Sequence, residues 1–382
     1  MDDGGERTRR GFRVKIRALL AGMALLVGAC GGGSAGTLPA SAGPIESMPA
    51  SPVGGGSTAA AASSAPATLA APAPRIVIVD TDVAPDDLVA LAFLLSAPNV
   101  TVAAITVSGT GEARCDGGVK VVLGLLESLQ APDIPVACGR GTPLAGSHAF
   151  PDAWRNAADS GSGLPIQPTE RKASGGSGVQ TFASAVAAND HPTILTLGPL
   201  TNLADALAGD PSLASRLGPV FVMGGAVHVP GNLLGPGAPV GNTVAEWNVY
   251  VDPHAAQVVI ASGLHLSFVS LDGTSQVPVT VAFAQRAVQT AATPAAGVLA
   301  QLLTANTFMA DGSYFLWDPL AAELAAGYPV GAFTPATVAV EEAEGPESGF
   351  TRPTTGDPNI DYLATVDATA AEETLLTVLN AR

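Results

Sequence analysis

Short apolar runs alternate with amphipathic stretches along most of the chain. The first run, residues 76–79, reads Ile-Val-Ile-Val, which is typical of a strand buried on both faces. Similar runs predict further strands at residues 101–107, 193–197, 219–223, 266–271 and 336–340. Apolar residues at helical spacing predict intervening helices at residues 86–96, 117–130, 179–188, 253–262 and 318–326. Strands separated by helices indicate βαβ units, so we predict an α/β fold: a single large Rossmann-like domain with a mainly parallel central sheet flanked by helices.

An acidic cluster follows the first predicted strand. Residues 80–87 read Asp-Thr-Asp-Val-Ala-Pro-Asp-Asp and place four carboxylates between a buried strand and a helix. In a parallel sheet, ligands bind beyond the carboxyl ends of the strands. Crowded carboxylates repel one another, and a hard divalent cation such as Ca²⁺ would offset their charge. The alternative is an acidic helix cap with solvated neighbours, since Asp86 and Asp87 fall in the first turn, where the helix dipole favours anions.

The N-terminal region has the pattern of an export signal rather than of a fold. Residues 7–17 carry six positive charges, and the apolar stretch that follows, residues 18–29, is too short to span a bilayer. Its end, Leu-Val-Gly-Ala-Cys, resembles the bacterial lipobox, so we expect a lipoprotein signal peptide at residues 1–29 and lipidation of Cys30. The Ala/Gly/Ser/Pro-rich segment up to residue 74 predicts a flexible tether, and residues 75–382 form the predicted domain. This pattern predicts an extracytoplasmic protein held on the bacterial cell membrane by a lipid anchor.

Composition narrows the choice of partners. The 382 residues include 17 Lys+Arg and 33 Asp+Glu, for a formal net charge of −16, which argues against nucleic acid as a partner. Three cysteines are too few for a disulfide scaffold. Cys115 and Cys138 flank the second predicted helix, and the sequence leaves open whether they pair.

Two enzyme families place Asp-x-Asp after a first strand. Haloacid-dehalogenase-type phosphatases expect Thr or Val two residues beyond the second Asp, where this chain has Ala84. The cluster more closely resembles the opening motif of the calcium-dependent nucleoside hydrolases, Asp-x-Asp-x-x-x-Asp-Asp. Three later segments resemble that family in order: Gly-Pro-Leu-Thr-Asn at 198–202, Met-Gly-Gly at 223–225 with Ala-Glu-Trp-Asn at 245–248, and Trp-Asp-Pro at 317–319. The resemblance runs from about residue 75 to the C-terminus.

The resemblance implies roles for individual residues. On the metal side it implies that Asp82 binds Ca²⁺ and acts as general base, and that Asp80 is a supporting acid. The other implied calcium ligands are Asp87, Asp318 and the backbone carbonyl of Leu197. The residues implied to bind the ribose hydroxyls are Asp86, Glu246, Asn248 and Asn232, with Asn242 as a rival to Asn232 because the intervening segment is longer than in the family pattern.

Activation of the leaving group departs from the commonest family pattern. Many members carry His-Asp-Pro, where the His is a general acid, but this chain has Trp317 at that position. Trp154 lies in a segment similar to the purine-specific branch, in which two tryptophans stack on the purine and ease its protonation. We therefore assign both residues to catalysis, with core packing as the alternative for each, and expect Trp247 in the core. The family's Gly-Asn after the second strand is also missing, and Glu112 is a candidate for a carboxylate there.

These expectations combine into one hypothesis. The chain would hydrolyse the N-glycosidic bond of ribonucleosides, preferably purine ribonucleosides, with a Ca²⁺-bound water activated by Asp82. A homo-oligomer remains open. The alternative is a non-catalytic surface lipoprotein that binds nucleosides or calcium on the same fold.

Overall fold

The computed structural model describes residues 72–381, so the predicted signal peptide, Cys30 and nearly all of the tether lie outside the described residues. The strands are β1 (Arg75–Thr81), β2 (Val100–Val107), β3 (Val136–Cys138), β4 (Thr193–Thr196), β5 (Val220–Met223), β6 (Leu266–Val269), β7 (Gly331–Ala336), β8 (Val338–Val340), β9 (Thr351–Pro353) and β10 (Ile360–Val366). The α-helices are α1 (Pro85–Ser96), α2 (Cys115–Ser128), α3 (Asp152–Ala158), α4 (Gly178–Ala188), α5 (Thr201–Gly209), α6 (Trp247–Val251), α7 (Pro253–Ile260), α8 (Leu271–Thr274), α9 (Val281–Thr290), α10 (Pro294–Ala305), α11 (Trp317–Ala326) and α12 (Ala368–Leu379). Two 3₁₀ helices are η1 (Pro211–Arg216) and η2 (Thr307–Ala310). Within this part of the chain, no helix combines the length and the apolar character needed to cross a membrane.

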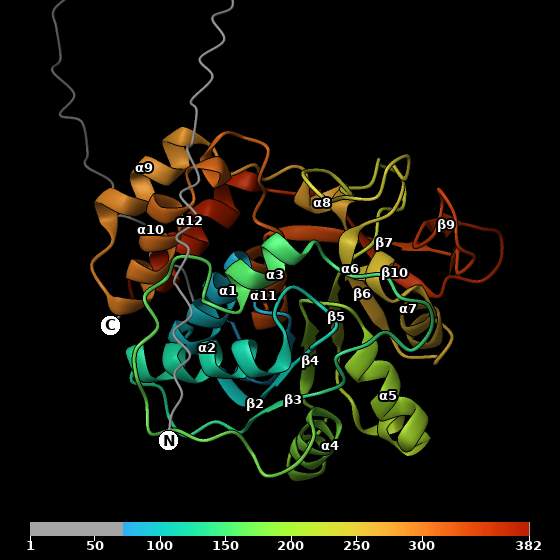
Figure 1. Cartoon of the computed structure of the whole chain (residues 1–382), viewed down its shortest axis with the longest axis horizontal. Helices are drawn as coiled ribbons and strands as arrows, with labels where there is room; N and C mark the ends of the chain where they lie inside the picture. Colours follow the sequence, from blue (N-terminus) through green and yellow to red (C-terminus); the bar gives the residue numbers. More distant parts are fainter. Residues whose placement is uncertain (1–71, 382) are drawn as a thin grey trace, which may run out of the picture. The chain divides into compact units, whose positions relative to one another are not determined.

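The central sheet has eight strands in the order β3-β2-β1-β4-β5-β6-β10-β7 (Figure 1). All neighbouring strands pair in parallel except β7, which pairs antiparallel with β10 at the edge. The predicted α/β fold with a mainly parallel sheet is therefore confirmed. From β1, the strands β2 and β3 follow one another toward one edge of the sheet, and the later strands, beginning with β4, extend toward the other edge. This reversal is a topological switch point, where α/β proteins open a crevice at the carboxyl ends of the strands.

Helices cover both faces of the sheet. Alternate residues of β1 point to opposite faces: Val77 and Val79 belong to the core cluster that includes residues of α1, α2, α10, α11 and α12, whereas Ile78 belongs to the cluster that includes residues of α4, α5 and α7. All three side chains are fully buried. This two-sided burial explains why the strand is an unbroken β-branched run, and it fixes the direction in which the residues after β1 leave the sheet.

The C-terminal part of the sheet corrects the sequence-based assignment. The single strand predicted at residues 336–340 is wrong: β7 ends at Ala336, and β8 pairs with β9 in a separate two-stranded sheet. Pro335 is accommodated in β7 because that strand lies at the sheet edge. Strands β3, β9 and β10 were not predicted, since β3 and β9 have only three residues each and β10 is half-exposed and lacks a continuous apolar run.

Candidate functional site

The acidic turn between β1 and α1 is held by Asp87. Its carboxylate accepts hydrogen bonds from the backbone N–H groups of Asp82 (3.1 Å) and Ala84 (3.1 Å), and from the hydroxyl of Thr81. Between these two N–H groups, Val83 has φ of 65°, in the left-handed region that a β-branched residue rarely adopts. The bonds to Asp87 hold this strained turn and aim Asp82 and Asp86 across the end of the sheet.

Five carboxyl groups are buried at this end of the sheet. Asp80, Asp82, Asp86, Asp87 and Asp318 are only 0–5% exposed. None of the ion pairs formed within residues 72–381 involves any of them. Packing alone rarely tolerates this arrangement, because buried charges without a partner are costly.

The electrostatics of the cluster reflect that cost. Burial, and then the charge of Asp87, raise the pKa of Asp86 to about 7. Burial and the charges of Asp87 and Glu112 raise the pKa of Asp82 well above its ordinary value. The pKa of Asp318 is raised in the same way by burial and by Asp86 and Asp87. A bound cation would favour the charged carboxylates and would therefore lower these pKa values.

The residues present fit a hard divalent cation. One carboxylate oxygen each from Asp86, Asp87 and Asp318 lie within 4.8 Å of one another. Asp318 Oδ1 is buried and has no hydrogen-bond partner, which marks an oxygen available to a ligand. Ca²⁺ and Mg²⁺ bind oxygen ligands, among them carboxylate oxygens. This closest triad contains Asp86, which the sequence assigned to ribose, and Asp82 lies beside it.

Asp82 is confined by two glycines. A Cβ at Gly111 would lie 2.3 Å from Asp82 Oδ2, and one at Gly198 would lie 2.9 Å from Asp82 Cγ. The backbone N–H of Glu112 donates to Asp82 Oδ2 (3.0 Å). The loops after β2 and β4 therefore approach the carboxylate so closely that no side chain fits at either glycine, and they fix its orientation.

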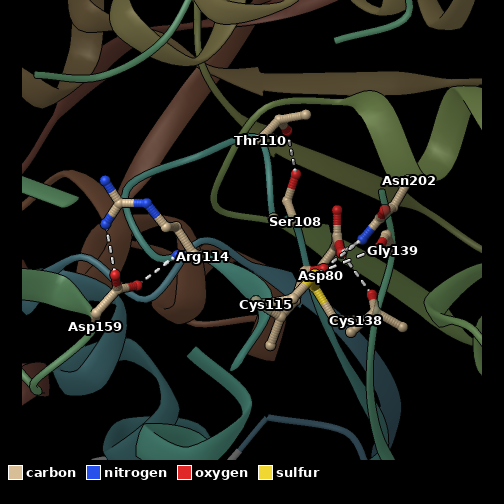
Figure 2. Close-up of a disulfide and its surroundings, with 12 residues drawn as sticks. Asp80, Ser108, Thr110, Arg114, Cys115, Cys138, Gly139, Asp159 and Asn202 are labelled. Carbon is tan, nitrogen blue, oxygen red and sulfur yellow. Dashed lines mark hydrogen bonds and ion pairs between the residues drawn. A yellow bond between two sulfur atoms is a disulfide. The ribbon is translucent and has the colours of Figure 1, made fainter. Parts of the chain in front are cut away.

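Asp80 lies behind this turn, next to a disulfide. Its Oδ1 accepts from Thr106 Oγ1 (2.5 Å) and Asn202 Nδ2 (2.7 Å), while Oδ2 is buried without a partner. Burial, as the largest cause, raises its pKa to about 7. Figure 2 shows Asp80 and Asn202 with the disulfide Cys115–Cys138, whose Cα atoms are 5.5 Å apart. The bridge joins the start of α2 to the end of β3, which answers the question that the sequence left open.

Polar side chains at the start of α6 lie at the carboxyl ends of the neighbouring strands β4 and β5. The carboxylate of Glu246 caps α6 by accepting from the N–H groups of Asn248 (2.9 Å) and Val249 (3.1 Å). Asn248 Nδ2 donates to the carbonyls of Leu197 (2.8 Å) and Met223 (3.2 Å), which places Asn248 at the ends of β4 and β5. The structure thus brings Asn248 and the Leu197 carbonyl into direct contact.

The two rival asparagines differ in how fully they are engaged. Asn242 is buried, donates to Ser348 O (2.8 Å) and accepts from two backbone N–H groups, so its amide is engaged by protein groups on both sides. Asn232 uses Oδ1 to accept from the N–H of Trp247 (3.1 Å), and within residues 72–381 its Nδ2 donates to no protein group. The free amide favours Asn232 over Asn242 for a ligand contact.

Aromatic side chains form two groups at the site. Trp154 on α3 packs on Trp247 with ring centroids 5.3 Å apart, and Trp247 is buried as expected. Trp317, at the start of α11, packs on Tyr314 at 4.5 Å. Both Trp154 and Trp317 are half-buried, and within residues 72–381 their rings do not pack on each other.

The sequence did not single out Tyr314, whose hydroxyl donates to Asp86 Oδ1 (2.7 Å). No local pattern reveals that contact, since 228 positions separate the two residues. No hydrogen bond or ion pair within residues 72–381 joins a histidine side chain to an acid of the cluster.

Known nucleoside hydrolases resemble this chain in sequence and in fold. Residues 77–373 match the family model of inosine-uridine preferring nucleoside hydrolases. The pyrimidine-specific ribonucleoside hydrolase RihA of Salmonella schwarzengrund is 34% identical over 229 residues, which are 59% of this chain and 70% of that protein. The fold is similar to that of an inosine-uridine preferring nucleoside hydrolase from Bacillus anthracis, with a TM-score of 0.72 and 23% identity over 81% of this chain and 100% of the other. A purine-preferring ribonucleoside hydrolase from Gardnerella vaginalis has a TM-score of 0.69 and 25% identity over 80% and 98% of the two chains.

Proposed function

The chain belongs to the inosine-uridine preferring nucleoside hydrolase family, and on this premise we propose that it hydrolyses the N-glycosidic bond of ribonucleosides to ribose and free base. The observation that supports this most strongly is the set of buried carboxylates at the switch point of the sheet, with no cationic partner within residues 72–381. Such an arrangement is costly for folding and suits a site that binds a cation and a sugar diol.

Different residues of the site would bind the metal, accept the proton and hold the ribose. We assign a calcium ion to Asp87, Asp318 and Asp82, with the Leu197 carbonyl as a further ligand. The ion would lower the pKa of the attacking water, so that the water can be deprotonated near neutral pH. Asp82, fixed by the Glu112 N–H and two glycines, would take the proton of the attacking water. Asp86, Asn232, Glu246 and Asn248 would orient the ribose, and Asp80 would act as a supporting acid near the metal.

For the base we propose a preference for purines, assisted by Trp317 and Trp154. Within residues 72–381 no histidine side chain forms a hydrogen bond or ion pair with the cluster, so departure of the base would depend on aromatic stacking that strengthens as a purine acquires a proton. The half-buried Trp317 directly precedes Asp318, which supports a ring position next to the reacting bond. The RihA relatives are pyrimidine-specific by name, so this preference separates the chain from them.

Incubation of the full chain with calcium and either inosine or uridine, with detection of free ribose, tests the activity and the preference together. We expect faster release from inosine, and an Asp82→Asn variant should lose about 10²–10⁴-fold in kcat while it stays folded. Faster release from uridine would overturn the purine proposal alone. Nucleoside binding without ribose release would favour the non-catalytic binding protein.

We also propose that the protein is exported and anchored to the membrane through Cys30. The lipobox-like segment carries this proposal. The disulfide Cys115–Cys138 supports it independently, because structural disulfides form in oxidising compartments.

A further inference from the structure

Tyr314 connects the two halves of the proposed site. It lies between η2 and α11, and its ring meets the indole of Trp317 at a centroid distance of 4.5 Å and an interplanar angle of 66°. Its hydroxyl donates to Asp86 Oδ1 at 2.7 Å. One side chain therefore contacts both the carboxylate assigned to ribose and the tryptophan assigned to the base.

The backbone of Tyr314 is fixed from outside the site. The N–H of Val279 donates to Tyr314 O (2.8 Å), and the next residue, Phe315, forms a β-bridge with Pro278. Phe308 packs edge-on against the tyrosine ring at 6.1 Å. With the main chain tied down and the ring held on two sides, the hydroxyl has a defined position.

The hydroxyl lies in a strongly negative environment. Burial and the charges of Asp86, Glu112 and Asp318 raise the pKa of Tyr314 well above its ordinary value, so the group keeps its proton. No other side chain within residues 72–381 donates a hydrogen bond to Asp86. The backbone N–H groups of Asp86 and Asp318 also favour the charged form of this carboxylate, so Tyr314 supplies the side-chain part of its restraint.

We propose that Tyr314 is a positioning residue that locks Asp86 for one ribose hydroxyl and thereby sets the preference of the site for ribonucleosides over 2′-deoxyribonucleosides. The inference rests on the proposed function. A site built to hydrogen-bond a substrate hydroxyl rejects the analogue that lacks it, because its own polar group is left unpaired. That discrimination requires the carboxylate to be held in place before the substrate arrives.

A purely structural role makes a different prediction. If Tyr314 only packs on Trp317 and Phe308, Tyr314→Phe keeps the ring and should leave sugar discrimination unchanged. A matched control is Tyr328→Phe. Tyr328 is 4% exposed, packs edge-on against Phe93 at 5.7 Å, and its hydroxyl has no hydrogen bond within residues 72–381.

The experiment compares the full chain, Tyr314→Phe and Tyr328→Phe on inosine and 2′-deoxyinosine with saturating calcium. We expect Tyr314→Phe to lower kcat/KM for inosine by about ten-fold, the equivalent of one charge-assisted hydrogen bond, and to change 2′-deoxyinosine little. The ratio between the two substrates should then fall by about ten-fold, while Tyr328→Phe keeps the wild-type ratio.

An unchanged ratio in Tyr314→Phe would overturn the proposal. If the wild-type chain binds nucleosides but does not hydrolyse them, the proposed function fails while the inference remains testable. The same ten-fold change is then expected in the ratio of dissociation constants measured by calorimetry. A wild-type chain that binds inosine and 2′-deoxyinosine equally, or binds neither, would refute the role of Tyr314 directly.

Discussion

Asp80→Asn should remove a large part of the pH dependence of stability in the calcium-free protein. Asp80 is 1% exposed, and burial raises its pKa from 3.8 to about 7. Each unit of pKa shift corresponds to about 1.4 kcal/mol, so a shift of this size is worth about 4 kcal/mol between the folded and unfolded states. Asparagine has nearly the same shape and can still accept from Thr106 and Asn202, but it does not titrate.

The direction of the effect follows from where the proton resides. Below about pH 4 the carboxyl is protonated in both states, so its protonation does not change the free energy of unfolding. As the pH rises toward 7, the unfolded chain releases the proton while folded Asp80 retains it, and stability falls. Above about pH 7 both states are ionised and the loss is complete. Asp80→Asn lacks this loss, so the variant should gain stability relative to wild type as the pH rises.

Thermal unfolding in EDTA, measured between about pH 4.5 and 7.5, tests this reasoning. At about 2 °C per kcal/mol for a domain of this size, the melting temperature of Asp80→Asn should rise by roughly 8 °C relative to wild type across the range. The exposed Asp116→Asn variant controls for loss of one negative charge. A constant difference between Asp80→Asn and wild type at all pH values would show that Asp80 ionises normally in the fold.

Three further predictions concern the ion, the base and the anchor. Calcium at 100 times its dissociation constant should stabilise the wild-type fold by about 2.7 kcal/mol, and Asp318→Asn should remove most of the resulting shift in melting temperature; an equal shift in both proteins would exclude Asp318 as a ligand. Trp317→Ala should lower kcat for inosine more than kcat for p-nitrophenyl riboside, whose leaving group departs as an anion, since stacking is worth about 1–3 kcal/mol per base. Equal losses on both substrates would mean that Trp317 only shapes the pocket. Cys30→Ala should move the protein from the membrane fraction to the soluble fraction, and a wild-type chain found soluble with Met1 intact would contradict export.

What the sequence predicted correctly is local in the chain. The run 76–79 and the acids that follow it are adjacent, so a buried strand ending in an acidic turn could be recognised directly. The contacts of Asp80 with Asn202 and of Asp86 with Tyr314 join residues 122 and 228 positions apart, and no spacing rule connects them. Edge strand β7 and its partner β10 were missed for another reason: half-exposed strands lack the continuous apolar run that marked β1.

The position of the site explains why such a costly cluster is compatible with a stable fold. Asp82 and Asp87 come from the β1–α1 region, Leu197 follows β4, and Asp318 lies in the first turn of α11, so the acids converge only when the sheet and α11 have assembled. The unfolded chain separates these charges. In the folded chain without an ion they repel one another, which favours their protonated forms and raises the pKa values of Asp82 and Asp318. A cation that binds only the assembled site therefore stabilises the fold through the same carboxylates that we assign to catalysis. Stability and activity should consequently respond to calcium over the same concentration range.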